Sequence, residues 1–385
     1  MWIARSIGPQ IHRLARNRPV IVLTGARQTG KTSLLRHLFP SLPMVSLDLP
    51  SEAEFAENDP RGFLSLYPPP VLIDEVQYAP SLFRHIKVWV DAHRSARGQF
   101  ILTGSQKFTL MRAVSDSLAG RTQILELEPL SVAEISSSLP RPPVHEAILR
   151  GGFPEIHADP SIDCFFFYRS YIATYLERDV RNLLGVTSLR DFERFLRACA
   201  LRTGQLLNKS DLARDTGISP STANQWLSVL EASGQVALLE PWFSNKTKSI
   251  TKSPKLYLTD TGLACALLNI RTADDLRRSP LLGQLWETCV FAELRKQETA
   301  RQLHWSIQYW RDRTREVDFV IDRGGRFHLL EAKWAENPRR GDADSLAFLS
   351  EELGAKNVES RQIVSPTQKA YPLDSGTRII PLSDL

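Results

Sequence analysis

The sequence predicts an α/β protein in which a parallel sheet flanked by helices is followed by a helical region and a second α/β unit. Residues 20–23 are an apolar run that leads into a glycine-containing loop, and the residues after the loop carry Leu34, Leu35 and Leu38 at helical spacing. Two further apolar runs, 71–73 and 100–102, are separated from the first by helical patterns. Strands that alternate with helices favour a parallel sheet, whose ligand lies beyond the carboxyl ends of the strands.

The first element, residues 1–18, is expected to be a short basic amphipathic helix. Ile7, Ile11 and Leu14 lie on one side of it. We expect the surrounding arginines to form a solvated face that packs beside the next domain: Arg5, Arg13, Arg16 and Arg18.

The loop after the first strand, residues 25–32, reads GARQTGKT and fills every fixed position of a phosphate-binding loop. Its two glycines let the backbone turn tightly, so that amide groups point at nucleotide phosphates, and the following helix adds the positive end of its dipole. Lys31 is expected to reach the β and γ phosphates, and Thr32 to ligate Mg²⁺. The pattern predicts an ATP or GTP site made by Gly25, Ala26, Arg27, Gln28, Thr29, Gly30, Lys31, Thr32 and Ser33.

The next two predicted strands end in polar residues that complete such a site. Residues 71–75 read VLIDE, so Asp74 can hold the Mg²⁺ shell, directly or through water, while Glu75 orients and polarises the attacking water. The strand at 100–102 runs into residues 103–106, TGSQ. Thr103, Ser105 or Gln106 could sense the γ-phosphate there, or could only cap the next helix.

From about residue 188 the pattern becomes that of a winged helix. A helix at 191–201 precedes a short helix and glycine turn within 208–219, then a helix at 221–232, and the strands 236–239 and 255–258 supply the wing. Winged helices bind DNA or serve as protein-interaction modules. Polar residues of the second helix suit phosphate and base-edge contacts: Ser221, Thr222, Asn224 and Gln225. The loop between these two strands carries several lysines, which could add phosphate contacts or form only a solvated surface. They are Lys246, Lys248, Lys252 and Lys255.

The last hundred residues carry a second group of candidate residues. A helix at 281–296 places Glu287 on an apolar face, where a carboxylate needs a partner such as a metal or a lysine. Strand-like stretches follow at 316–321 and 327–333. Strand alternation puts Glu331 and Lys333 on one face, and Asp318 can face them from the neighbouring strand.

Composition narrows the classes of partner and compartment. The chain has 48 basic and 43 acidic residues, a formal charge of +5 and an isoelectric point near 9.0, which permits a polyanionic partner without requiring one. The four cysteines are widely spaced, without a CxxC pair, so neither a zinc site nor a disulfide framework is indicated. The sequence lacks an apolar run long enough to span a membrane and a signal-peptide pattern. We therefore expect a cytoplasmic protein without membrane contact.

Several motifs together resemble a bacterial and archaeal group of AAA+-type P-loop ATPases fused to a C-terminal domain of unknown function: GARQTGKT, VLIDEVQ, ILTGSQ, LAGRTQILELEPLS, GGFPE and YIATYLERDV. The resemblance extends over nearly the whole chain. It implies an AAA+ core with a short N-terminal helix at 1–128 and a helical lid at 129–187, ahead of the winged helix at 188–270 and a C-terminal domain at 271–385. It also implies ATP and Mg²⁺ as cofactors, and a homo-oligomer in which one subunit completes its neighbour's site.

An arginine finger is the completing group that this resemblance implies, since a guanidinium neutralises charge on the transferred phosphoryl group. The candidates are Arg121, in the LAGR turn, and Arg178, in the LERD segment. Each is also explained by a structural ion pair. The usual lid arginine is not evident in GGFP.

The C-terminal domain resembles the PD-(D/E)XK restriction-endonuclease-like core. The arrangement that carries the resemblance is Glu287 with Asp318, Glu331 and Lys333. It implies that Asp318 and Glu331 hold one or two Mg²⁺ ions, and that Lys333 positions water and offsets negative charge. The same residues could instead bind DNA or stabilise the domain without cutting.

The sequence therefore leaves three functions to compare. One is an ATP-hydrolysing protein that binds and remodels or translocates DNA as an oligomer. The second is an ATP-gated switch or scaffold with slow turnover, which binds DNA or a protein partner. The third is an ATP-gated, metal-dependent DNA nuclease.

Overall fold

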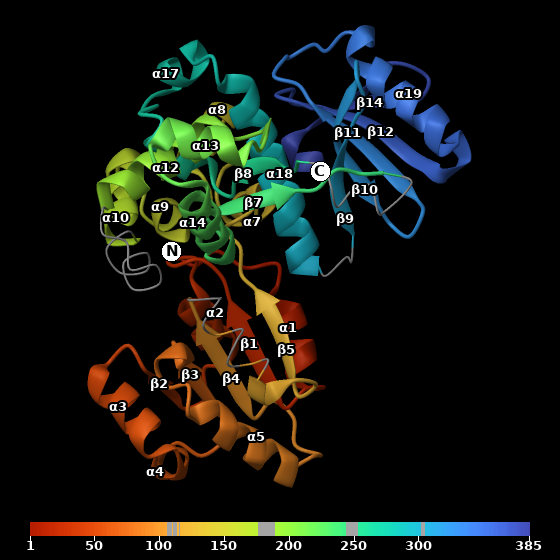
Figure 1. Cartoon of the computed structure of the whole chain (residues 1–385). Coiled ribbons are helices and arrows are strands. Elements are labelled where there is room, and N and C mark those ends of the chain that lie inside the picture. The colour runs from red at the N-terminus through yellow and green to blue at the C-terminus, as the bar shows by residue number, and fades with distance from the viewer. Residues whose placement is uncertain (106–109, 111–113, 115, 176–188, 244–252, 302–304) are drawn as a thin grey trace.

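A computed structural model describes residues 1–385 except 106–109, 111–113, 115, 176–188, 244–252 and 302–304. The described strands form three sheets, of five, three and six strands. Figure 1 shows the five-stranded sheet and its helices as one body, with the rest of the chain gathered in a second body at the carboxyl ends of its strands.

The five-stranded sheet has the order β2-β3-β4-β1-β5, and all its pairs are parallel, as the sequence predicts. Every residue of β1, β3 and β4 is buried, which is typical of strands covered on both faces. The strands are β1 (Val20–Thr24), β2 (Met44–Ser46), β3 (Val71–Asp74), β4 (Phe100–Gly104) and β5 (Thr122–Glu126).

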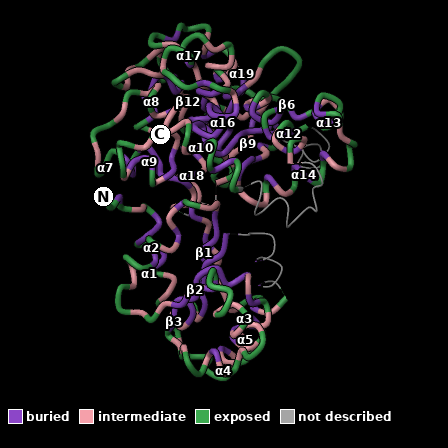
Figure 2. The backbone as a smooth tube through the Cα atoms, turned by 90° about the vertical axis from the view of Figure 1, so that its left-hand side faces the viewer, coloured by how far each residue is buried: buried purple, intermediate pink, exposed green. Residues whose placement is uncertain are grey.

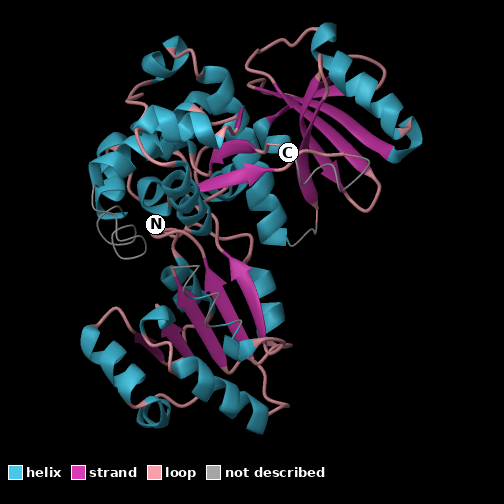
Figure 3. Ribbon diagram, in the orientation of Figure 1, coloured by secondary structure: helices cyan, strands magenta, loops and turns pink. Residues whose placement is uncertain are grey.

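Helices cover both faces of this sheet (Figure 3). On one face, Ile7 and Ile11 pack with Leu34 and Leu35 against β1, so α1 (Gly8–Ala15) and α2 (Lys31–Leu38) share a core. The other face carries a separate cluster that includes Phe63, Phe83 and Ile86. These side chains come from α4 (Pro60–Leu66) and α5 (Leu82–Ala92), beside α3 (Pro50–Asn58) and the short 3-10 helix η1 (Val76–Tyr78).

A series of short helices follows β5 and leads to the small middle sheet. The helices are α7 (Val132–Ser138), α8 (Val144–Arg150), α9 (Pro154–Ala158), α10 (Cys164–Tyr175) and α12 (Leu189–Leu201). The middle elements are β6 (Gln205–Leu206), α13 (Lys209–Thr216), α14 (Pro220–Ala232), β7 (Val236–Leu239) and β8 (Lys255–Leu258). The sheet order is β6-β8-β7, with antiparallel pairs.

Local signals set the turn between α13 and α14. The Asn208 side chain accepts from two backbone amides at the start of α13, and Gly217 ends that helix with a φ of 72°. Ser219 then caps α14, and Pro220 occupies its first turn. The helices α13 and α14 pack together.

The C-terminal sheet has the order β13-β14-β12-β11-β10-β9. α18 contacts β11 and the middle strand β8, while α19 packs across β10, β11 and β12. The elements are α16 (Thr261–Leu267), α17 (Ala273–Arg278), α18 (Leu282–Arg301), β9 (Ser306–Arg311), β10 (Glu316–Asp322), β11 (Phe327–Ala332), η3 (Arg340–Ala343), α19 (Asp344–Leu353), η4 (Ala355–Asn357), β12 (Val358–Ser365), β13 (Tyr371–Pro372), β14 (Thr377–Pro381) and η5 (Leu382–Asp384).

One hydrophobic cluster extends from the short helices to the C-terminal sheet, and a separate cluster that includes Leu346 and Leu349 lies under α19. The first cluster joins Phe153 of the short helices, Trp226 of α14, Trp286 of α18 and Phe319 of β10. The tube in Figure 2 shows buried residues along β1 and through the interior of the second body. Within the described residues, no helix is both long and apolar enough to cross a membrane.

Candidate functional site

The phosphate-binding loop turns tightly between β1 and α2. A side chain at Gly25, where φ is 142°, would place its Cβ 2.3 Å from the Leu127 carbonyl oxygen, so this position requires glycine. Gly30 caps α2 with a φ of 88°, and Gln28 also has a positive φ, of 61°. The loop thus reaches the N-terminus of α2 in a shape that exposes backbone amides to an anion.

Lys31 is held inside the loop. Its Nζ donates to the carbonyl oxygens of Gly25 at 3.1 Å and Ala26 at 2.8 Å. A cavity of about 710 Å³ lies over the loop, and the first residues of the chain and the short helices line its other side. Its lining includes Arg27 through Ser33 of the loop and helix, Glu75, Trp2 and Tyr171. A nucleotide triphosphate fits a cavity of this size.

Asp74, at the end of β3, is surrounded by hydroxyl groups. Its Oδ1 accepts from Thr32 Oγ1 at 2.8 Å and from Thr103 Oγ1 at 2.5 Å, and its Oδ2 accepts from Ser46 Oγ at 3.3 Å. Thr32 and Asp74 face each other with oxygen atoms, which are the ligands that Mg²⁺ prefers, so these residues fit the predicted ion. Ser46 was not predicted, although it lies directly beside Asp74 in the parallel pair of β2 and β3.

Glu75 is held by several donors. Its backbone has a left-handed φ of 54°, and its amide donates to Thr103 Oγ1 at 3.1 Å. The Glu75 carboxylate accepts from Gln77 Nε2, from the Ser105 amide at 3.2 Å and from Ser105 Oγ at 2.9 Å. Burial acts to raise the pKa of Glu75, but these donors and the charge of Lys31 outweigh it and hold the pKa below its ordinary value.

Thr103 and Ser105 thus lie against the two acids, whereas Gln106 lies outside the described residues. Gln77 is a site residue that the sequence analysis missed. The signal was its place two positions after Glu75 in the VLIDEVQ stretch, where an amide follows the acids into a turn.

Arg121 lies at the other end of the sheet. It precedes β5, whose residue Thr122 pairs with Val20 at the start of β1, and the five-residue strand spans roughly 16 Å before it reaches the loop. Its guanidinium binds Asp91 through Nε at 2.7 Å and Nη2 at 3.1 Å. A contact between Arg121 and the nucleotide of its own chain is therefore excluded, and a contact with a neighbouring subunit stays a prediction. Arg178 lies outside the described residues.

Arg5 is buried beside the phosphate-binding loop, which the sequence analysis did not predict. Its side chain is 6% exposed, with Nη1 donating to the Thr29 carbonyl oxygen at 2.9 Å and Nη2 to the Glu128 carbonyl oxygen at 2.5 Å. Its Nε lies 3.3 Å from Glu134 Oε2. The expected solvated arginine face is wrong here because Arg5 precedes α1. Alternation along this non-helical segment places it with the buried Ile3 and Ile7.

Comparisons with known proteins match three family models to the chain. The AAA domain matches residues 17–136, and two domains of unknown function, DUF8612 and DUF4143, match residues 141–274 and 282–385. The uncharacterised proteins Rv2008c of Mycobacterium tuberculosis and Mb2031c of Mycobacterium bovis are each 31% identical over 384 residues, which covers 99% of this chain and 84% of theirs. The chain belongs to their family.

Solved structures are similar at lower identity. The Walker-type ATPase PABY2304 of Pyrococcus abyssi is 16% identical, with a TM-score of 0.48 over 68% of this chain and 94% of its own. The RuvB Holliday junction branch migration motor of Thermotoga maritima is 17% identical, with a TM-score of 0.30 over 61% of this chain and 89% of its own. The match of the AAA domain, together with the loop geometry, supports ATP binding and hydrolysis by residues 17–136.

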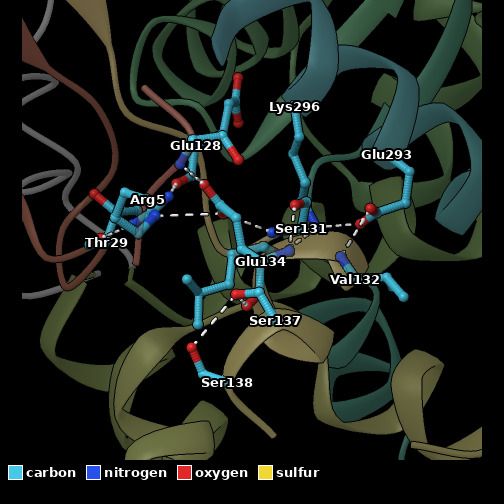
Figure 4. A network of polar contacts seen from close by, with 12 residues as sticks. Arg5, Thr29, Glu128, Ser131, Val132, Glu134, Ser137, Ser138, Glu293 and Lys296 are labelled. Carbon is cyan, nitrogen blue, oxygen red and sulfur yellow. Dashed lines mark hydrogen bonds and ion pairs between the residues drawn. The ribbon is translucent and has the colours of Figure 1, made fainter. Parts of the chain in front are cut away.

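The segment that follows β5, residues 128–134, is bound from two sides (Figure 4). From the N-terminal side come Arg5 and the Ser6 amide, which donates to Glu134 Oε1 at 2.6 Å. From the DUF4143 side comes α18. Its contacts are Arg295 Nη2 to Glu128 Oε1 at 2.6 Å, the Val132 amide to Glu293 Oε2 at 2.9 Å, and Lys296 Nζ to the Leu130 carbonyl oxygen at 2.9 Å. A continuous polar path therefore joins the phosphate-binding loop to α18.

The turn that follows α14 lies beside the phosphate-binding loop. A methyl group built on Gly234 would lie 3.9 Å from Cβ of Ala26 in the loop. Gln235 Nε2 donates to the hydroxyl of Tyr171, which lines the cavity, at 2.9 Å.

The residues predicted to bind DNA lie mostly at the start of α14. Ser221, Asn224 and Gln225 are exposed, and Thr222 is half-buried, with its amide bound by the Ser219 cap. The candidates Lys246, Lys248 and Lys252 lie outside the described residues.

Lys255 is not part of an exposed basic loop. It is the first residue of β8 and is 2% exposed, with its Nζ 2.8 Å from Glu287 Oε1, 3.4 Å from Asp318 Oδ1 and in contact with Glu316 Oε1. The expectation of exposure is wrong because the four residues of β8 are all buried. Of the two partners expected for Glu287, a metal or a lysine, the structure provides the lysine.

Glu331 and Lys333 lie at the end of β11. Lys333 Nζ is 3.0 Å from Glu331 Oε1, and Asp318 Oδ2 accepts from the Ala332 amide at 2.9 Å. Glu331 Oε2 is buried without a hydrogen-bond partner. Burial, and then the charge of Asp318, raises the pKa of Glu331 to about 8. Over the described parts of the chain, no three His, Cys, Asp or Glu side chains are arranged to hold a metal ion, so the Mg²⁺ expected in this domain does not fit the residues as they lie.

Proposed function

We propose that the protein hydrolyses ATP in its AAA domain and uses the nucleotide state to control DNA bound by residues 188–270, acting as a homo-oligomer. One observation carries the proposal. Thr32, Asp74 and Glu75 converge at the edge of the sheet, beside a phosphate-binding loop and under a cavity large enough for a nucleotide.

Each residue of the site has a chemical task. Backbone amides of residues 25–30 bind the phosphates, and Lys31 leaves its two loop carbonyls to bind the β and γ phosphates. Thr32 and Asp74 would hold Mg²⁺, which neutralises charge on the phosphates. Glu75 orients a water and accepts its proton. Its lowered pKa keeps it ionised across the physiological range.

An oligomer is proposed because the site needs a further cation for the charge that develops on the transferred phosphoryl group. Arg5 and Arg27 are the arginines that line the cavity among the described residues. Arg5 is already bound to Thr29 and Glu128. In addition to Arg27 of the loop, we propose a guanidinium from a neighbouring subunit, with Arg121 and Arg178 as candidates.

Binding of DNA by a winged helix is supported by the order of elements from α12 to β8 and by the three-stranded sheet. The exposed residues Ser221, Asn224 and Gln225 offer donors and acceptors to a phosphate or a base edge. The turn that follows this helix lies beside Ala26 and Tyr171 of the nucleotide site. A nucleotide that moves the loop would therefore move a DNA-contacting helix.

Turnover of ATP with and without duplex, single-stranded and branched DNA tests the proposal. In Glu75→Gln we expect ATP binding to persist while turnover falls about 10²–10⁴-fold, the usual contribution of a general base, and a DNA complex to be trapped. The matched control is Glu54→Gln, an exposed acid on α3, which should leave turnover unchanged. If DNA leaves turnover unchanged and Glu75→Gln traps no complex, DNA is not the partner, and a slow nucleotide-gated switch for a protein partner becomes the better interpretation.

The DNA surface has its own test. Asn224→Ala with Gln225→Ala should weaken DNA binding and abolish any DNA stimulation, while basal ATP turnover stays within about twofold because neither side chain lines the nucleotide cavity. Asn58→Ala, on the exposed end of α3, is the control. Unchanged DNA affinity in the double variant would place the DNA contact elsewhere.

A further inference from the structure

The acidic cluster of the DUF4143 domain encloses a buried ammonium group. Lys255 Nζ lies 2.8 Å from Glu287 Oε1 and 3.4 Å from Asp318 Oδ1, and it also contacts Glu316 Oε1. The three carboxylates come from α18 and β10, whereas the lysine comes from β8 of the middle sheet. The side-chain ammonium group of Lys255 therefore lies where the three carboxylates converge.

The chemistry of this point favours an ammonium over a metal ion. Nζ can donate three hydrogen bonds, and three carboxylate oxygens surround it. Mg²⁺ requires oxygens at about 2.0–2.1 Å in octahedral geometry, and a cation that entered here would have to displace the lysine. Buried carboxylates that repel one another need a charge of opposite sign, and Lys255 supplies it.

The position of Lys255 is fixed by the backbone around it. β8 pairs with β7, and the chain after β7 joins the DUF4143 sheet through the Trp242 amide, which donates to the Tyr309 carbonyl oxygen at 2.6 Å. The Tyr309 hydroxyl donates to the Ser253 carbonyl oxygen at 2.6 Å, two residues before Lys255. Lys255 is thus placed by a sheet-to-sheet junction and is not a surface side chain that swings into the cluster.

We infer that Lys255 is the resident cation of this cluster: it excludes divalent metal ions from the DUF4143 domain and ties β8 to α18 and β10. As folded here, the domain does not carry out metal-dependent DNA cleavage. Removal of the lysine opens a divalent-cation site formed by Glu287, Glu316 and Asp318. The inference does not rest on the proposed ATPase function.

The test uses nucleotide-free, full-length protein titrated with Mn²⁺, with bound ion measured by electron paramagnetic resonance. We expect the wild type to have no Mn²⁺ site that depends on Asp318, so the wild type and Asp318→Asn should bind the same amount of Mn²⁺. In Lys255→Met we expect a lower melting temperature, one additional Mn²⁺ per chain, partial recovery of the melting temperature by that ion, and loss of the ion in Lys255→Met with Asp318→Asn.

Lys333→Met is the matched control, because it removes a lysine from the same face but leaves Lys255 in place, and it should gain no ion. A wild-type Mn²⁺ site that Asp318→Asn abolishes would overturn the inference, as would a folded Lys255→Met that gains no ion. If Lys255→Met does not fold, the wild-type titration decides alone: a site that depends on Asp318 overturns the inference, and its absence supports it.

Discussion

At the scale of single residues, hydrogen-bond donors decide how strong an acid each buried carboxylate is. Glu75 and Glu331 are both buried, and burial acts to raise the pKa of each. Gln77 and Ser105 donate to Glu75 and bring its pKa below the ordinary value. At Glu331, burial and the charge of Asp318 outweigh the hydrogen bond from Lys333, and the pKa rises to about 8. The lowered pKa keeps Glu75 ionised at neutral pH, whereas the raised pKa keeps Glu331 largely protonated there.

Removing a donor from Glu75 should therefore change the pH dependence of hydrolysis. In Gln77→Leu the pKa of Glu75 rises, so the acid limb of kcat/KM moves to higher pH, while turnover on the plateau changes less. The stability that the lowered pKa provides is present above the unfolded pKa and is lost as pH falls through the folded pKa, and the variant should lose part of it. A pH profile from about pH 5 to 9 measures the limb.

The control for this profile is Gln99→Leu, which removes an exposed amide that bonds to the Arg97 carbonyl oxygen at the far end of β4. Its profile should match that of the wild type. An acid limb that stays in place in Gln77→Leu would show that Glu75 does not act as the base.

Arg5 should contribute to both stability and nucleotide affinity. Arg5→Met leaves Glu134 without its cation and two carbonyl oxygens without their donor, so we expect a loss of about 3–5 kcal/mol in the free energy of unfolding, and weaker ATP binding because Thr29 is in the loop. Urea denaturation and titration with a fluorescent ATP analogue measure the two effects. Arg13→Met, on the exposed side of α1, should change stability by less than about 0.5 kcal/mol. Equal stabilities of the two variants would contradict this role for Arg5.

At the scale of elements, the sequence was informative wherever one short pattern contained all that an element needs. The apolar runs at 20–23, 71–73 and 100–102 became β1, β3 and β4, and Pro220 starts α14 after the Ser219 cap. The polar residues that follow β3 and β4 meet because parallel strands end at the same edge. The predicted parallel sheet is confirmed for this reason.

Contacts between distant elements could not be predicted in this way. Lys255 is 32 residues from Glu287 and 63 from Asp318 in sequence, and periodicity identified each strand without showing which strand faces which helix. A lysine at the end of a basic segment is usually solvated, so only the three-dimensional junction of β7 and β9 reveals its burial. Arg5 was misplaced because the helix begins at Gly8, after it.

The strand β11 should make the stability of the protein depend on pH. Because the folded pKa of Glu331 is raised to about 8, its contribution to stability is fully present below the unfolded pKa and is lost as pH rises through about 8. We expect the melting temperature of the wild type to fall by several degrees between about pH 5 and 8.5, and Glu331→Gln, which stays neutral, to flatten that decline. Circular dichroism melts measure it. Glu352→Gln, exposed on α19, is the control, and an equal decline in Glu331→Gln would contradict the raised pKa.

At the scale of the whole molecule, α18 connects the two candidate sites. The 20-residue helix is about 30 Å long. It presents Glu287 to the acidic cluster, and nearer its C-terminus Glu293, Arg295 and Lys296 to the segment that leaves the AAA domain. Because Arg5 continues this path to Thr29, a shift of the phosphate-binding loop has a route of packed polar contacts to the DUF4143 domain (Figure 4).

We therefore expect nucleotide binding to change amide hydrogen exchange in α18 and β10, measured by mass spectrometry with and without a non-hydrolysable ATP analogue. Glu293→Leu with Lys296→Met removes the contacts to the Val132 amide and the Leu130 carbonyl oxygen, and neither substituted side chain lines the nucleotide cavity, so the analogue should still bind while its effect on β10 is lost. Asp274→Asn with Arg277→Met, an exposed ion pair on α17, should keep the effect. If the effect on β10 survives in the α18 variant, the coupling does not pass through these contacts, and the shared core that joins Phe153 to Phe319 becomes the alternative route.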